Sequence, residues 1–146
     1  MYLLTKDEIE ARCTEAREDP GLLAAPYDPG KAYEAKAGTP AGDGTTPPAP
    51  LEVAETLKDV FDPEIPVNIY DLGLIYDINV SPSGDTSVLM TLTAPNCPAA
   101  DILPGEVAET VAALSGVGRV GVELTFEVPW VPDMMSEIAK VSLGIY

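Results

Sequence analysis

The periodic spacing of apolar residues after Pro50 constrains the fold of this chain more than any other feature. Apolar side chains from Leu51 to Phe61 recur every three or four residues, which predicts a helix. Apolar and polar residues then alternate from Leu74 to Val80, and again around Val88 to Leu92. Because a stretch rich in turn-forming residues, 81–85, separates these two runs, we predict an antiparallel hairpin with one buried face.

The remaining pattern adds two helices and one strand. An apolar stripe at helical spacing runs from Leu103 to Leu114, and strict alternation from Val120 to Val128 is the clearest strand signal in the chain. A last short helix runs through Ala139, with Gly144 as its C-terminal cap. The element order α-β-β-α-β-α predicts an α+β, two-layer domain in which helices cover one face of a three-stranded sheet.

Residues 1–50 are expected to form an N-terminal extension to the domain at residues 51–146. Thr5 and Glu8 form a capping box, which predicts a helix over residues 6–18. Proline and glycine punctuate the stretch that follows, whose composition is typical of a linker or an irregular cover. We therefore place the domain boundary near Pro50.

Charge restricts the partners of the chain. Its 24 acidic and eight basic residues give a net charge of −16, and fifteen acids against three bases follow Pro50. Such a chain is repelled by phosphate backbones and by anionic membranes, so we expect no nucleic-acid or membrane partner. A basic protein or a metal cation fits better, although solubility alone is the simpler explanation. The sequence has no signal-peptide pattern or membrane-length apolar run, so a soluble cytoplasmic protein is expected.

The absence of histidine excludes histidine-based catalysis and every histidine-ligated metal site. The two cysteines, Cys13 and Cys97, lie far apart and form no Cys-x-x-Cys pair. One chain therefore cannot complete a four-thiolate cluster, whereas two symmetric copies could each contribute one Cys97.

Cys97 is the candidate metal ligand. Proline is favoured at the first position of a helix, so Pro98 makes Cys97 a candidate N-cap whose thiol pKa is lowered by the helix dipole. Pro104 requires either a kink or a single turn before the main helix. A buried and inert cysteine is the alternative, and the residues alone weigh the two equally. Cys13 lies on the narrow apolar stripe of the first predicted helix and is interpreted as structural.

Carboxylates offer a second kind of ligand. Three carboxylates, Asp62, Glu64 and Asp71, lie between the helix predicted from Leu51 to Phe61 and the strand that begins at Leu74. They could complete a mixed iron site with a thiolate. The simpler interpretation is that Asp62 ends a helix, Asp71 caps a turn and Glu64 is solvated. Tyr70, Tyr76, Trp130, Met134 and Met135 are interpreted as core or rim residues.

Three motifs resemble one known family. The run DPEIPVNIYDLGLIY at residues 62–76 resembles the opening signature of the SufT-like iron–sulfur cluster assembly domain. The run TAPNCP at residues 93–98 is similar to its second motif, and PWVPDMMS at residues 129–136, with Leu143 and Gly144, to its third. Together the motifs extend over about residues 51–146. Related PaaD-like proteins carry a further cysteine-rich region, and the end of this chain at Tyr146 favours the SufT-like branch.

The resemblance implies a role in iron–sulfur protein maturation, with Cys97 as the functional thiol and Asp71, Glu64 and Thr93 beside it. Thr93 and Pro98 are the expected binding residues, and iron or a cluster is the expected transient cargo. Assembly proteins, client apo-proteins and a second copy of the chain are the expected partners.

Two other function classes compete with a maturation factor. An acidic interaction adaptor with no metal chemistry of its own is the alternative function. An enzyme with a nucleophilic cysteine is disfavoured because neither a histidine nor another candidate base lies near Cys97 in sequence, so a non-enzymatic protein is expected.

Overall fold

The computed structural model describes residues 23–42, 44–62, 65–93, 102–128 and 130–144. The helix predicted over residues 6–18 lies outside these ranges. The elements in chain order are β1 (Ala35–Ala37), α2 (Pro50–Leu57), α3 (Ile69–Leu72), β2 (Ile75–Val80), β3 (Thr86–Met90), α4 (Leu103–Ala112), β4 (Val120–Leu124), the 3-10 helix η2 (Pro132–Met134) and α5 (Glu137–Leu143). The predicted α+β class is confirmed. Among the described helices, none has both the length and the apolar character needed to cross a bilayer.

The sheet has four strands in the order β1-β4-β3-β2, not the predicted three. Strands β2 and β3 form the predicted antiparallel hairpin, whereas β3 and β4 are parallel and are joined through α4. The additional strand β1 pairs antiparallel with the edge of β4, with Ala35 opposite Val122. Its sequence, Ala-Lys-Ala, is short and lacks β-branched or aromatic residues, so this pairing depends on the neighbouring edge and not on local preference.

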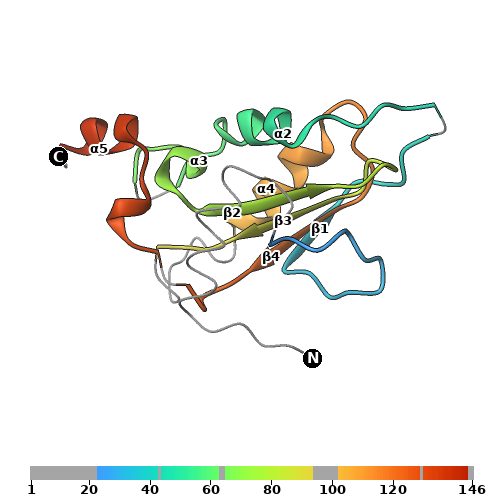
Figure 1. The fold of residues 1–146 in the computed structure, drawn as a ribbon, viewed down its shortest axis with the longest axis horizontal. Helices are drawn as coiled ribbons and strands as arrows, with labels where there is room; N and C mark the ends of the chain where they lie inside the picture. The colour runs from blue at the N-terminus through green and yellow to red at the C-terminus, as the bar shows by residue number, and fades with distance from the viewer. Residues whose placement is uncertain (1–22, 43, 63–64, 94–101, 129, 145–146) are drawn as a thin grey trace.

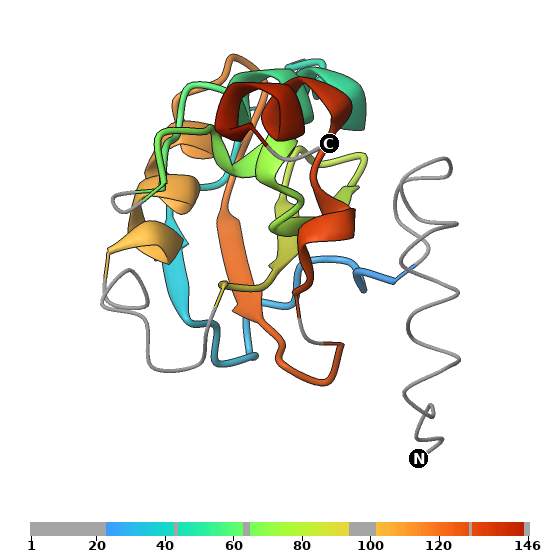
Figure 2. The same ribbon diagram turned by 90° about the vertical axis from the view of Figure 1, so that its left-hand side faces the viewer.

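Helices cover one face of this sheet and form the main core with it (Figures 1 and 2). Val53 and Leu57 of α2 and Val107 of α4 pack there against Val88 and Val122 of the central strands. All five side chains are at most 1% exposed. The apolar stripes recognised in the sequence therefore form the core between the two layers.

A β-bulge in β2 makes the hairpin differ from the predicted one. The register of β2 against β3 shifts between Ile75 and Asp77, so Ile75 and Ile78 both belong to the core under the helices. Tyr76 instead packs with Val128 in a second apolar cluster. The prediction of a single buried face is therefore wrong, because the extra residue in β2 breaks the strict alternation.

Several element ends differ from the predicted ones. Helix α2 ends at Leu57, and Phe61 forms an isolated bridge with Asn68 instead. Strand β4 ends at Leu124, and Phe126 beyond it is 40% exposed although the alternation continues. Pro104 lies in the first turn of α4, where its missing N–H removes no helical hydrogen bond.

Candidate functional site

The structure describes only part of the predicted site. Cys97 and Pro98 lie in residues 94–101 and Glu64 lies in residues 63–64, all outside the described residues, as does Cys13. Asp71 and Thr93 are described, and both are half-buried. Helix α4 begins at Leu103 with Ile102 as its N-cap, so Cys97 is not the N-cap of α4.

The segment that contains Cys97 connects two fixed points of the fold. Strand β3 ends at Met90, and the buried Thr91 that follows donates its N–H to the carbonyl of Leu74 at 2.8 Å. On the other side, Thr125 donates its N–H to the carbonyl of Met90 at 2.9 Å. The chain therefore leaves the sheet for residues 94–101 between the start of β2 and the end of β4. The carboxyl ends of parallel strands are a common place for binding sites in α/β sheets.

Beyond the undescribed segment, the chain returns at the start of α4. Ile102 is 51% exposed, whereas Leu103 is fully buried in the main core. Buried residues thus fix both ends of the connection, Leu92 before it and Leu103 after it.

Asp71 belongs to the short helix α3, directly before β2. The amide Nδ2 of Asn68 donates to its carboxylate at 2.7 Å, and its own N–H donates to Asn68 Oδ1 at 2.9 Å. Asn68 is the N-cap of α3, and Gly73 ends the helix in the left-handed conformation with φ of 87°. This arrangement matches the simpler interpretation, in which Asp71 stabilises a turn.

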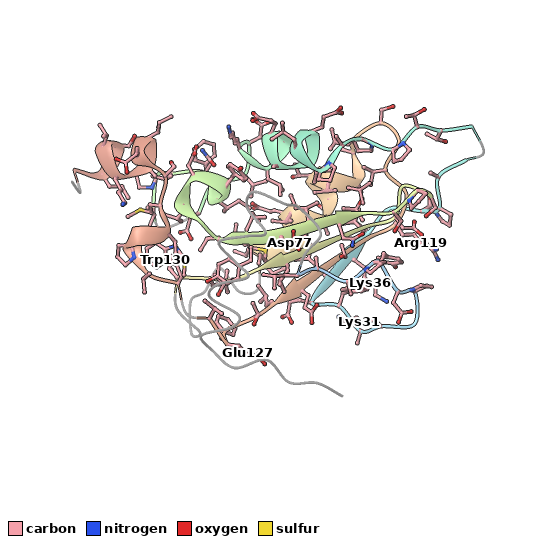
Figure 3. All side chains as sticks on the ribbon, in the orientation of Figure 1. Lys31, Lys36, Asp77, Arg119, Glu127 and Trp130 are labelled. Atoms are coloured by element: carbon pink, nitrogen blue, oxygen red, sulfur yellow. The ribbon has the colours of Figure 1, made fainter. Side chains whose placement is uncertain are left out.

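The third motif holds α3 in place. The indole Nε1 of Trp130, which is labelled in Figure 3, donates to the carbonyl of Leu72 at 2.8 Å. Ser136 donates its N–H to the carbonyl of Asp71 at 2.8 Å. The hydroxyl of the buried Tyr76 donates to the carbonyl of Val128 at 2.8 Å. The first and third motifs, about sixty residues apart in sequence, therefore form one packed unit.

A cavity of about 200 Å³ lies within this unit. Its walls are formed by Tyr70, Ile75, Met134, Met135 and Ser136. Sequence reasoning interpreted Tyr70 and the methionine pair as core or rim, and Met135 is a core residue while Tyr70 is 36% exposed. The cavity itself was not predicted, because it depends on the approach of segments distant in sequence. Its volume is below that of typical small-molecule sites and suits a single side chain.

Asp62, the third carboxylate considered, has a structural role. It is 5% exposed, its N–H donates to the carbonyl of Val67 at 3.3 Å, and its Oδ1 accepts from the N–H of Ile65 at 3.2 Å. Within the described ranges, no three acidic or cysteine side chains form a group that could hold a metal ion. A mixed site made by Cys97 with Asp71 or Glu64 stays a prediction, since two of these three residues lie outside those ranges.

Two solved structures share this α+β fold. A domain of unknown function from Bacillus anthracis superimposes with a TM-score of 0.64 at 31% identity, covering 66% of this chain and 92% of that domain. A conserved hypothetical protein from Thermotoga maritima gives a TM-score of 0.61 at 36% identity, covering 69% of this chain and 99% of that protein.

Sequence relatives assign the family. The Fe-S protein maturation auxiliary factor of Porphyromonas gingivalis is 53% identical over 93 residues, covering 64% of this chain and 89% of the relative. The Fe-S protein maturation auxiliary factor SufT of Staphylococcus aureus is 37% identical over 86 residues, covering 59% of this chain and 98% of the relative. The model of the family described as iron–sulfur cluster assembly protein matches residues 51–124. This chain belongs to that family, and the SufT-like resemblance of its motifs is confirmed.

Proposed function

We propose that this protein is a non-enzymatic maturation factor that delivers iron or an iron–sulfur cluster to client proteins through the thiolate of Cys97. The observation that carries the proposal is family membership through relatives named Fe-S protein maturation auxiliary factors. The place of residues 94–101, between the carboxyl end of β3 and the first turn of α4, supports a binding role for the segment that contains Cys97.

Transient delivery requires only weak binding of the iron or cluster. A thiolate is a soft ligand that suits iron–sulfur clusters, whereas stable clusters need four protein ligands. The family domain of one copy contributes one cysteine, so we propose that it passes iron or a cluster on instead of retaining it. Two copies that each contribute Cys97 would hold the cargo longer, which makes a homodimer the proposed resting form.

The neighbouring residues would support this thiolate. Asp71 and Glu64 would supply hard carboxylate oxygens that iron also accepts, and Thr93 and Pro98 are the proposed binding residues beside Cys97. The carboxylate of Asp71 already accepts a hydrogen bond from Asn68 at 2.7 Å. Its participation would therefore require that this bond be exchanged or shared.

The direct test compares Cys97→Ser with Cys13→Ser in the full chain. Cells that depend on the protein are assayed for the activity of client iron–sulfur enzymes, and the purified variants are reconstituted anaerobically with iron and sulfide. We expect Cys97→Ser to lose client activation and the cluster absorbance, and Cys13→Ser to keep both. Full client activity with Cys97→Ser would refute the thiolate role.

The same assay separates the alternative of an acidic adaptor that recruits assembly proteins without metal chemistry. In that case Cys97→Ser is active, whereas charge reversal on the surface abolishes partner capture. Glu127→Lys is the suitable reversal because Glu127 is exposed. Glu123 is less suitable, since its carboxylate binds the ammonium of Lys31 at 2.9 Å and its change would also disturb residues before the family domain.

A further inference from the structure

The face of the sheet opposite the helices is covered by residues 23–34, which we name the strap (Figures 1 and 2). The strap forms no helix or strand, and it lies between the undescribed N-terminus and β1. Ala24 is its one buried residue, and the others are half-buried or exposed. A segment with so little buried surface belongs to the part of a fold that opens most easily.

Three polar side chains of the sheet bind the first residues of the strap through their backbone. The carboxylate Oδ2 of Asp77 accepts the N–H groups of Leu23 and Ala24 at 2.5 and 2.6 Å. Asn79 Nδ2 donates to the carbonyl of Ala24 at 2.9 Å. Ser87 Oγ donates to the carbonyl of Ala25 at 2.5 Å. Backbone groups are common to all peptides, so this row of side chains is able to hold an extended peptide of varied sequence.

One side chain of the strap adds an apolar contact. Leu23 packs against the cluster formed by Tyr76 and Val128, to which Leu89 and Met134 also belong. Ala24, which follows it, is 7% exposed and has room for a small side chain only. The bound peptide therefore needs an apolar residue followed by a small one, and neither can be proline because both N–H groups are used.

The second half of the strap is held by aromatic and charged contacts. The ring of Tyr33 lies directly over Gly121 of β4, where a Cβ atom would approach the ring carbons to 2.6–2.7 Å. Tyr27 stacks on Tyr33 with 5.3 Å between ring centroids, and the guanidinium of Arg119 lies 5.2 Å from the Tyr27 centroid. Lys31, Lys36 and Arg119 extend from this end of the sheet (Figure 3). Such contacts close to solvent are weak and sensitive to salt.

The family domain forms without a counterpart of the strap. The family model begins at residue 51, and stretches of 93 and 89 residues of this chain already cover 89% and 87% of two relatives. The main core under the helices contains no strap residue. The strap therefore lies outside both the main core and the part of the chain that the family model matches.

We propose that this outer face is a peptide-binding surface that the strap occupies in cis, and that an extended segment of a partner protein displaces it. The partner segment presents an apolar residue such as leucine, then a small residue, with two free backbone N–H groups for Asp77. Because the strap is tethered, its local concentration is in the millimolar range, so the bound strap limits access to partners. This proposal is independent of the thiolate of Cys97.

The test measures binding of a fluorescent peptide that copies residues 20–28 to full-length variants, by anisotropy. Leu23→Asp places a second carboxylate beside Asp77 and should release the strap while the face stays intact. We expect it to bind the peptide at least about tenfold more tightly than the wild type does. Adding Asp77→Ala to Leu23→Asp removes the oxygen that accepts both N–H groups and should abolish binding. Glu127→Gln, an exposed acid, is the control and should behave as the wild type.

Hydrogen exchange supplies the second measurement. In Leu23→Asp, the amides of residues 23 and 24 should exchange faster than in the wild type. In Gly121→Ala, the amides of Tyr33 and its neighbours should exchange faster. The Gly121→Ala change removes the space for the Tyr33 ring without altering the core under the helices. A released strap with no gain in peptide binding would overturn the proposal. So would equal binding by the Leu23→Asp variants with and without Asp77→Ala, or a strap that stays protected in both Leu23→Asp and Gly121→Ala.

Discussion

The ion pair between Asp85 and Arg119 offers the most direct test of how the sheet is held together. The guanidinium Nη2 of Arg119 lies 2.7 Å from Asp85 Oδ2, and the backbone N–H of Arg119 donates to Oδ1 at 2.8 Å. Asp85 closes the turn between β2 and β3, and Arg119 immediately precedes β4. One carboxylate therefore connects the hairpin to the parallel strand that follows α4.

The expected cost of Asp85→Asn follows from burial and from the kind of bond. The Asp85 side chain is only 10% exposed, so water replaces the lost contacts poorly. Hydrogen bonds to a charged group contribute about 1.5–3 kcal/mol each, and the Arg119 side chain is 34% exposed, which reduces its share. The backbone bond to Oδ1 can persist in the asparagine. We therefore expect Asp85→Asn to lower the free energy of unfolding by about 2 kcal/mol.

A double-mutant cycle tests whether Arg119 is the residue through which Asp85 stabilises the fold. Arg119→Gln removes the charge and also the contact with Tyr27, so its own effect is not specific. In the Arg119→Gln background, however, the cost of Asp85→Asn should fall to about half or less, because the two residues share the interaction. Urea unfolding of the four proteins at pH 7 gives the required free energies.

The pH dependence gives an independent check. The hydrogen bond from Arg119 is the main cause that holds the pKa of Asp85 below its ordinary value of 3.8. A carboxyl group with a lowered pKa in the folded state stabilises the protein above its unfolded-state pKa and loses this effect as pH falls through the folded-state value. The stability difference between wild type and Asp85→Asn should thus be constant near neutrality and shrink below about pH 4. A difference below about 0.5 kcal/mol at pH 7, or one that grows on acidification, would refute the assigned role.

Two further predictions concern the unit formed by the first and third motifs. Tyr76→Phe should lower the free energy of unfolding by about 1–2 kcal/mol, because it leaves the buried carbonyl of Val128 without the hydroxyl at 2.8 Å; an unchanged urea midpoint would contradict this. Gly73→Ala should cost more than Gly144→Ala in the same assay, although both glycines have positive φ, of 87° and 75°. A Cβ at Gly73 would collide with the Met134 backbone, whereas one at Gly144 has no atom of the described residues within 4 Å, so equal costs would contradict this packing.

Local pattern was sufficient for most elements after Pro50. The hairpin, the helix after residue 102 and the cap at Gly144 follow from periodicity and turn chemistry within a few residues, and each is present. Strand β1 and the parallel pairing of β3 with β4 were not predicted, because they depend on contacts between residues 34 to 87 positions apart. The bulge at β2 was also missed, because the run of three apolar residues from Leu74 to Tyr76 does not show where the register against β3 shifts.

In the candidate site, too, some features follow from local sequence and others do not. The motif around Cys97 could be recognised from sequence because its residues are consecutive, whereas the side chain that caps the turn at Asp71 is that of Asn68. The cavity beside Tyr70 could not be predicted, since its walls come from three separate segments. Asp77 and Asn79 are polar residues of the alternating run from Leu74 to Val80, and a hairpin with one buried face places such residues on its solvent side.

The burial of Asp77 shows why that interpretation failed and why the strap is held weakly. Asp77 is 4% exposed, and its two carboxylate oxygens accept three backbone N–H groups, those of Leu23, Ala24 and Ile78. Taking a carboxylate out of water is costly unless such bonds replace its hydration, so much of the energy of the new bonds only offsets this cost. In the proposed open state, rehydration of the Asp77 carboxylate would offset part of the bonds lost with Leu23 and Ala24. The free energy that separates the two states would then be smaller than the number of these bonds suggests.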